Sequence, residues 1–467
     1  EADNSEWLYK ANDSGTNRKT FTVSMWFKRT ELSNDYMQLW QGGANGEATR
    51  MGFYGGTPKE AIWVDVGGGS GNTGSDYRSY SVQVARDTSA WYHIVLAVDT
   101  TQGTAANRLK VWLNGDEITT WTNQAIPAQD FQCSLEASIN MHWGAYNSTY
   151  YKMCGYIAEC HYLDGVAKVQ TDFGEYDEDS GIWIPKEYDG TYGGNGCYLK
   201  FDDSSDLGAD SSGNGNDFTL NNIAAADQAV DTPTNNFCIL NPLHRNSGGS
   251  NNGRQNNSIF TEGNTYIAGN LLSYWQSGVG TFGFTKGKWY FEAQPALSTG
   301  LYTIGMGDEG DIANWGQNNN FPGAAYGGVV SQSQGYGGGG NVEHASTYGN
   351  SPGVTYNNSN IIGVAIDVDN GYVYYSKDGS FVNSGNPASG GNGTGGYVIR
   401  TGSPSNGTYF MGVGFHSTNS ATRVNFGGYT TISISSAASD ANGYGTFEYA
   451  PPSGYYALCT KNLAVYG

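Results

Sequence analysis

The chain has 467 residues, of which 38% are hydrophobic and only 14% are charged. Aromatic residues make up 14% of the chain. Because disordered chains are poor in aromatic residues, this composition excludes a chain that is disordered throughout. The net charge of −20 repels phosphate backbones and anionic lipids, so neither nucleic acid nor a membrane surface is an expected partner. No run of about 18 apolar residues occurs, so we expect no membrane insertion.

The first part of the chain reads as one strand after another. Every second residue from Phe21 to Phe27 is apolar, which predicts a strand with one buried face. The Asn114-Gly115 pair suits a type I′ turn, so residues 108–118 predict a hairpin. Further strands are expected at residues 61–66, 80–87, 91–99, 156–165 and 197–203.

A second series of strands begins near residue 282. The sequence around Asp369-Asn370-Gly371 predicts another hairpin within residues 360–381. Residues 316–359, which precede it, predict a long loop, and long exposed loops on a rigid sandwich commonly carry binding specificity. Further strands are expected at residues 286–294, 301–307, 408–416 and 421–427.

Between the two series the composition changes to turn-rich and low-complexity polar sequence. This change predicts a connector that packs partly on its neighbours. The predicted fold class is therefore all-β, with two antiparallel β-sandwich (jelly-roll) domains at residues 1–202 and 259–467, joined by a turn-rich connector at residues 203–258.

Six cysteines occur, and none of them forms the CxxC spacing of the usual zinc and redox sites. An even number permits disulfides, but buried free thiols in strands are an equally good interpretation. The cysteines are Cys133, Cys154, Cys160, Cys197, Cys238 and Cys459.

The ordered series of strand motifs resembles a known arrangement. Residues 21–29 (FTVSMWFKR), 89–115 and 155–165 (GYIAECHYLDG) resemble a laminin-G or concanavalin A-like jelly roll, as found in the virion proteins of marine bacteriophages. Such proteins continue with a SPRY-like β-sandwich, which residues 287–293 (GKWYFEA) and 361–379 resemble here. The resemblance implies a laminin-G/concanavalin A-like first domain and a SPRY-like second domain.

The resemblance also implies a function. We expect a non-enzymatic virion surface or fibre protein, located on the virion surface, that binds glycans, the host surface or neighbouring virion subunits. Its expected partners are other virion proteins, further copies of itself and cell-surface glycans. The alternatives are a purely structural, self-assembling surface or filament protein without a ligand and, as a minor alternative, a carbohydrate-active enzyme.

A catalytic site of the glucanase kind is not expected. Such glucanases carry two glutamates on one strand in an E-x-D-x-x-E pattern, which flank the glycosidic bond. The nearest match begins at Glu175, and it has Ser180 where the second glutamate is needed. The resemblance brings no assigned catalytic residues either, so we predict none.

A group of oxygen-bearing side chains in one irregular stretch makes calcium the candidate cofactor, because Ca²⁺ prefers oxygen ligands on loops. Asp and Asn side chains also form turns without an ion, so that interpretation stays open. The candidate ligands are Asp202, Asp203, Asp210, Asn214 and Asp217.

Exposed aromatic rings would suit a glycan, because a sugar presents apolar C–H faces that stack on them. Trp315 and Tyr336 lie in or beside the long loop, so we take them as candidate glycan-binding residues, and Trp63 as a third. Packing in the core is the alternative for each ring.

Overall fold

The computed structural model describes residues 6–12, 16–32, 36–43, 48–67, 77–135, 140–146, 151–244, 258–269, 275–297, 301–312, 315, 322, 334–344, 347–348, 352–399, 407–416 and 420–467. The chain divides into two compact units, Glu1–Gln228 with Thr232–Thr234, and Ala229–Asp231 with Asn235–Gly467. The division falls inside the connector expected at residues 203–258. Residues 203–228 fold with the first unit, and residues 235–244 fold with the second.

The first unit contains an eight-stranded antiparallel sheet. Its strands are β1 (Trp7–Ala11), β3 (Met37–Gly42), β4 (Thr49–Phe53), β5 (Ala61–Val66), β6 (Tyr77–Val84), β10 (Trp121–Asn123), β11 (Asn140–Trp143) and β16 (Thr219–Asn221). They lie in the order β10-β6-β5-β4-β3-β11-β1-β16, so β3 to β6 are neighbours both in the chain and in the sheet.

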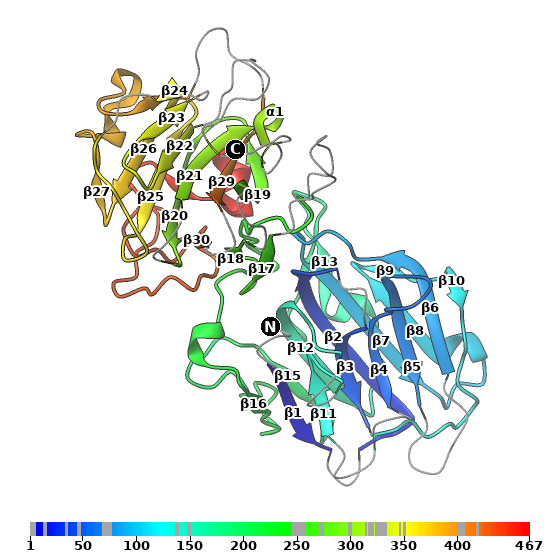
Figure 1. Ribbon diagram of the computed structural model, residues 1–467. Coiled ribbons are helices and arrows are strands. Elements are labelled where there is room, and N and C mark those ends of the chain that lie inside the picture. The colour runs from blue at the N-terminus through cyan, green and yellow to red at the C-terminus, as the bar shows by residue number, and fades with distance from the viewer. Residues whose placement is uncertain are drawn as a thin grey trace. The chain divides into compact units, whose positions relative to one another are not determined.

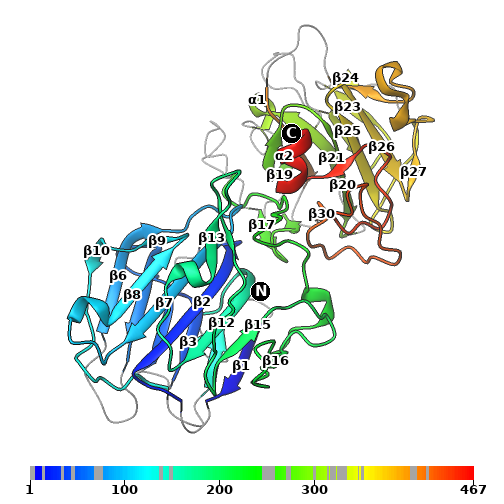
Figure 2. The same cartoon turned by 180° about the vertical axis from the view of Figure 1, so that it is seen from behind.

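A six-stranded sheet packs against it. Its strands are β2 (Thr20–Arg29), β7 (Tyr92–Asp99), β8 (Leu109–Leu113), β9 (Asp116–Glu117), β12 (Gly155–Asp164) and β15 (Cys197–Leu199), in the order β15-β12-β2-β7-β8-β9. The two sheets are stacked (Figure 1), and β12 and β15 stand at one end of the six-stranded sheet (Figure 2). Apolar side chains from both sheets, among them Phe21, Val23, Ile62 and Val64, fill the space between them and are wholly buried.

The outer side of the six-stranded sheet is also covered, which the alternation in β2 does not predict. A hairpin of β13 (Gly174–Tyr176) and β14 (Trp183–Pro185) places Trp183 near His93. Trp183 Nε1 donates a hydrogen bond to His93 Nδ1 at 3.0 Å, and Ser24 Oγ lies 2.8 Å from His93 Nε2. Burial lowers the pKa of His93 to about 3, so the ring is neutral near pH 7.

Both predicted hairpin turns are present. Asn114 and Gly115 have φ angles of 50° and 90°, as a type I′ turn requires, and they join β8 to β9. Gly371, with φ of 80°, closes the turn between β25 (Ile362–Asp367) and β26 (Tyr372–Lys377).

The second unit is built from two further sheets. One contains β17 (Ile259–Thr261), β18 (Tyr266–Ala268), β20 (Lys288–Pro295), β25, β26, β27 (Ser380–Phe381), β28 (Tyr397–Val398), β30 (Ala421–Asn425) and β31 (Tyr456–Ala457). The other contains β19 (Trp275–Phe284), β21 (Leu301–Asp308), β22 (Gln334–Gly337), β23 (Val342–His344), β24 (Thr347–Tyr348) and β29 (Tyr409–His416). Three strands, β22 to β24, therefore lie where the sequence predicted only a loop, and much of the rest of residues 316–359 lies outside the described residues.

A core of apolar side chains separates these two sheets, with Trp289, Val364 and Val413 wholly buried in it. A second cluster on the outer side of the larger sheet joins Tyr290 to Phe447 from the C-terminal segment. The short helix α2 (Thr460–Tyr466, red in Figure 2) follows. The remaining helical elements are the α-helix α1 (Glu309–Ile312) and the 3-10 helices η1 (Ala105–Asn107), η2 (Gln170–Asp172), η3 (Ala225–Asp227) and η4 (Pro387–Asn392).

The all-β prediction is confirmed, since both units are built from sheets with short helical turns, and the strand pairs are antiparallel apart from the parallel pair β20–β31. All six cysteines are buried and none forms a disulfide, which matches the second interpretation, buried thiols in strands. None of the helices in the described ranges is long and apolar enough to cross a membrane.

Candidate functional site

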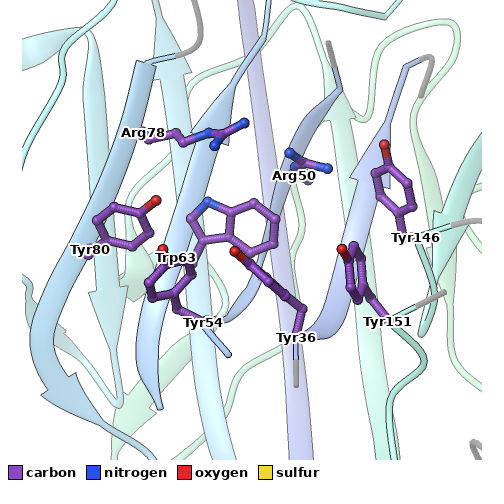
Figure 3. Close-up of a pocket in the computed structure, with 8 residues that line it drawn as sticks. All are labelled: Tyr36, Arg50, Tyr54, Trp63, Arg78, Tyr80, Tyr146 and Tyr151. Carbon is purple, nitrogen blue, oxygen red and sulfur yellow. The ribbon is translucent and has the colours of Figure 1, made fainter. Parts of the chain in front are cut away.

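The outer side of the eight-stranded sheet carries a pocket of about 400 Å³. Five tyrosines, one tryptophan and two arginines line it (Figure 3). They are Tyr36, Arg50, Tyr54, Trp63, Arg78, Tyr80, Tyr146 and Tyr151. This volume lies within the range of roughly 300–1,000 Å³ that small-molecule sites occupy.

The pairing of β4, β5 and β6 brings the pocket residues together. On β5, Ile62, Val64 and Val66 are part of the core, so the alternate residues Trp63 and Asp65 lie on the outer side. Asp65 is paired with Arg50 of β4 and with Arg78 of β6. Two residues before Asp65 on the same face of β5, Trp63 is paired with Tyr80 of β6. A charged row and an aromatic row therefore lie side by side across the sheet.

The charged row is centred on Asp65, which is 1% exposed. Its Oδ2 accepts hydrogen bonds from Arg50 Nη2 at 2.9 Å and from Arg78 Nε at 3.1 Å. The side chain of Arg50 is 8% exposed, whereas that of Arg78 is 44% exposed. Asp65 therefore lies between two guanidinium groups, which favour the ionised form of its carboxyl group.

The indole of Trp63 joins the two rows. The Arg50 guanidinium lies 4.5 Å from the centre of its ring, a cation–π contact. Trp63 is 2% exposed, and its buried Nε1 has no hydrogen-bond acceptor among the described residues. In Figure 3 this nitrogen points toward the side of the pocket where the arginines lie. Buried polar groups normally have a partner, so a donor of this kind in a pocket wall is suited to a ligand or a water molecule.

The tyrosines and Arg78 form the accessible part of the wall, since all five tyrosines are partly exposed and Arg78 is exposed. Tyr36 contacts Tyr54, Trp63 and Tyr151 with ring centres 5.1, 5.1 and 4.7 Å away, and Tyr54 lies 4.3 Å from Tyr80. Burial, together with a hydrogen bond to Tyr54, raises the pKa of Tyr36 to about 12. Tyr36 therefore keeps its proton near neutral pH and presents a neutral hydroxyl that can donate and accept.

Of the three aromatic candidates, the structure places only Trp63 in the pocket wall, and because Trp63 is itself 2% exposed it offers its Nε1–H there but no open ring face for stacking. Trp315 and Tyr336 are 1% and 0% exposed, so the expectation that they offer rings for stacking is wrong. Trp315 packs against Gly412 of β29, and Tyr336 packs against Tyr356 at 5.0 Å. Proximity to a long loop did not make these rings accessible, because each one fills the core of the second unit.

The candidate calcium ligands are used in turns. Asp210 accepts hydrogen bonds from the backbone N–H groups of Tyr198 and Asn216, both at 2.9 Å, and its own N–H donates to Asp217. The Asn214 side-chain amide donates to the carbonyl of Gly196.

The remaining two candidate ligands, Asp202 and Asp203, bind side chains close to them in the sequence. Asp202 pairs with Lys200 at 2.9 Å, and Asp203 accepts from Ser205. In the described part of the chain no three His, Cys, Asp or Glu side chains come together as metal ligands. This geometry matches the turn interpretation of these residues.

The glucanase-like stretch also folds as a turn. Glu175 lies on β13, and Asp177 accepts a hydrogen bond from the N–H of Ser180 at 2.7 Å, which closes the link to β14. The acidic residues of this stretch do not line the pocket.

Residues 4–159 match the family model Laminin_G_3, described as the concanavalin A-like lectin/glucanases superfamily. This match covers the strands that build the pocket, and the first unit has the stacked antiparallel sheets of a concanavalin A-like sandwich. The sequence matches no curated protein.

Among solved structures, the chain is similar to the SPRY domain of human HERC1, with 12% identity, a TM-score of 0.25, and coverage of 36% of this chain and 91% of that one. It is similar to a candidate carbohydrate-binding protein from Bacteroides ovatus, with 16% identity, a TM-score of 0.29, and coverage of 46% and 56%. The TRIM65 PSpry domain gives 12% identity, a TM-score of 0.27, and coverage of 40% and 91%.

Proposed function

We propose that this chain is a non-enzymatic glycan-binding protein and that the pocket on the eight-stranded sheet is its binding site. The observation that carries the proposal is the combination of partly exposed tyrosine rings with arginine and indole donors in one cavity. A sugar presents apolar C–H faces and a rim of hydroxyl groups. The rings would pack against the first, and the hydroxyl, guanidinium and indole groups would hydrogen-bond with the second.

The composition of the pocket supports binding without hydrolysis. Glycosidases of the usual kind need two carboxyl groups on either side of the scissile bond, about 5–10 Å apart. None of the eight described lining residues is Asp or Glu. The neighbouring carboxylate, Asp65, is buried and bonded to two arginines, so it is poorly placed to transfer a proton or attack a sugar.

We further propose that the chain is displayed on the surface of a virion, beside other virion proteins and further copies of itself. The support for this setting is the ordered series of motifs that resembles marine phage virion proteins. Immunogold electron microscopy of purified particles tests it, and labelled particle surfaces or fibres are the expected result. Unlabelled particles, with the protein in the soluble fraction, would contradict it.

A glycan array tests the binding proposal. We expect the purified chain to bind a restricted set of glycans and the Tyr80→Ala variant to lose most of that binding. The matched control is Tyr176→Ala, because Tyr176 is 54% exposed on β13 and does not line the pocket. If the chain binds no glycan but assembles into filaments, the purely structural alternative replaces the proposal. Release of reducing sugar from a bound polysaccharide would instead establish an enzyme.

A further inference from the structure

We infer that the pocket selects sugars that carry an N-acetyl group, and that Trp63 recognises the carbonyl oxygen of that group through its indole N–H. This inference rests on the proposed glycan-binding function and names the class of ligand. Its starting point is a hydrogen-bond donor in the pocket wall. Trp63 is 2% exposed, and its Nε1–H has no acceptor among the described residues.

The position of this donor sets it apart from others of its kind. Trp26, Trp40 and Trp143 also have a buried Nε1 without an acceptor among the described residues. Trp26 stacks on His93, and Trp40 and Trp143 lie in the core between the two sheets. None of these three residues lines the pocket, whereas Trp63 does. Of these indoles, Trp63 is therefore the one whose donor a sugar in the pocket can satisfy.

The groups around the indole favour an acceptor that has no proton of its own. The Arg50 guanidinium, 4.5 Å from the centre of the Trp63 ring, can only donate. Asp65, on the same face of β5, already accepts from Arg50 and Arg78. A ligand group at this place therefore meets donors. A carbonyl oxygen accepts without donating, whereas a sugar hydroxyl brings a proton that needs an acceptor in turn.

The net charge of the chain decides between an acidic and a neutral acceptor. Carboxylates and sulfates also accept without donating, but a chain with a net charge of −20 repels polyanions. A neutral carbonyl carries no such penalty. The acetamido group of an N-acetylated sugar supplies one, and an amide carbonyl is a strong acceptor.

The aromatic side of the pocket suits the rest of an acetamido group, an apolar methyl and an N–H. The partly exposed ring of Tyr36 lies 5.1 Å from that of Trp63, and Tyr80 is paired with Trp63 across the sheet. Figure 3 shows Tyr36, Tyr54 and Tyr80 around the indole. Their rings offer apolar surface for the methyl, and a tyrosine hydroxyl can accept from the N–H. A donor, an apolar surface and an acceptor thus meet in one pocket.

The test compares sugars that differ at a single substituent. N-acetylated chitotriose and cellotriose share a β-1,4-linked backbone, and chitotriose has an acetamido group where cellotriose has a hydroxyl. By calorimetry we expect chitotriose to bind at least tenfold more tightly. The fully deacetylated trimer is the control for charge. It is cationic and the chain is acidic, so weaker binding of this trimer would exclude charge as the cause of the preference.

A variant locates the effect at the indole nitrogen. Trp63→Phe keeps an aromatic ring and removes the Nε1–H, so it should weaken chitotriose binding by about tenfold and bring it close to that of cellotriose. Trp121→Phe is the matched control, because Trp121 lies on β10 of the same sheet and does not line the pocket. Thermal melting of both variants separates a loss of recognition from a loss of folding.

The indole N–H resonances give a second readout, one that needs no variant to fold. In ¹⁵N–¹H spectra of the unsubstituted chain, one indole resonance should move when chitotriose is added and stay in place when cellotriose is added. Its absence from the spectrum of Trp63→Phe would assign it to Trp63. The resonances of Trp40 and Trp143 should not move, because these indoles lie in the core.

The outcomes distinguish this inference from the proposed function. If the two trimers bind equally and Tyr80→Ala weakens both, or if the glycans bound on the array lack N-acetyl groups, the glycan site stands and the preference is refuted. If chitotriose is preferred but no indole resonance moves and Trp63→Phe binds it as well, Trp63 is not the residue that recognises it. If no glycan of any kind binds, the proposed function itself fails.

Discussion

Replacing Asp65 with alanine removes the carboxylate that lies between Arg50 and Arg78. The two arginines would respond differently, because the Arg50 side chain is 8% exposed and that of Arg78 is 44% exposed. Arg78 can be rehydrated, whereas Arg50 would remain as a buried cation without this partner. Breaking a buried ion pair by removing one side costs about 3–5 kcal/mol, and since one arginine of the two is stranded, we expect the lower end, about 3 kcal/mol.

For a unit of this size, a loss of about 3 kcal/mol lowers the melting temperature by roughly 6–12 °C. Urea denaturation of Asp65→Ala, Arg50→Ala and the double variant measures the free energy of unfolding of each. The double variant should be more stable than Asp65→Ala, because it leaves no buried charge behind. Asp116→Ala, at an exposed position on β9, is the control and should change little.

The reasoning would be refuted if Asp65→Ala cost less than about 1 kcal/mol, or if the second substitution gave no recovery. Either result would mean that Arg50 is well solvated without Asp65, and the pocket would then be less enclosed than its geometry indicates.

The first unit should lose stability as the pH falls from about 6.5 toward 5, because burial lowers the pKa of His93 and His161 to about 3 each. Over this range the unfolded chain binds protons that the folded chain does not, so the free energy of unfolding decreases as the pH decreases, and above about pH 7 it no longer depends on these two groups. Calorimetric melting at pH 7 and pH 5 measures the change. The His93→Gln variant should show a smaller change in stability between the two pH values. EDTA should leave the melting temperature unchanged, because Asp210 and its neighbours are bonded within turns; a clear fall would revive the calcium site. Trp315→Ala should destabilise the second unit by about 3–5 kcal/mol in denaturant melts and leave glycan binding intact; lost binding with unchanged stability would restore Trp315 as a ligand contact.

Local signals predicted the strands well. Alternation from Phe21 to Phe27 and the Asn114-Gly115 turn depend on neighbouring residues, so they are readable in the sequence. The sequence did not predict that Trp183 covers the six-stranded sheet, because this packing depends on a contact with His93, 90 positions away in the chain. Alternation predicts which residues share a face, but it does not say whether the opposite face is also covered.

The pocket could be predicted only in part. Trp63 was a candidate as an aromatic residue in a strand, yet its neighbours Arg50 and Arg78 come from separate strands and meet through the register around Asp65. The tyrosines gave no signal of their own, because the chain contains 34 of them. Three alternating patterns taken together, in β4, β5 and β6, would have placed these side chains on one face. Their register could not be fixed without the structure.

A crystal structure of the chain with the strongest ligand from the array tests the central claim most directly. We expect sugar density against Tyr54 and Tyr80, with an acceptor oxygen about 3 Å from Trp63 Nε1. Ligand density on another surface, with the pocket holding only solvent, would contradict a glycan site on the eight-stranded sheet.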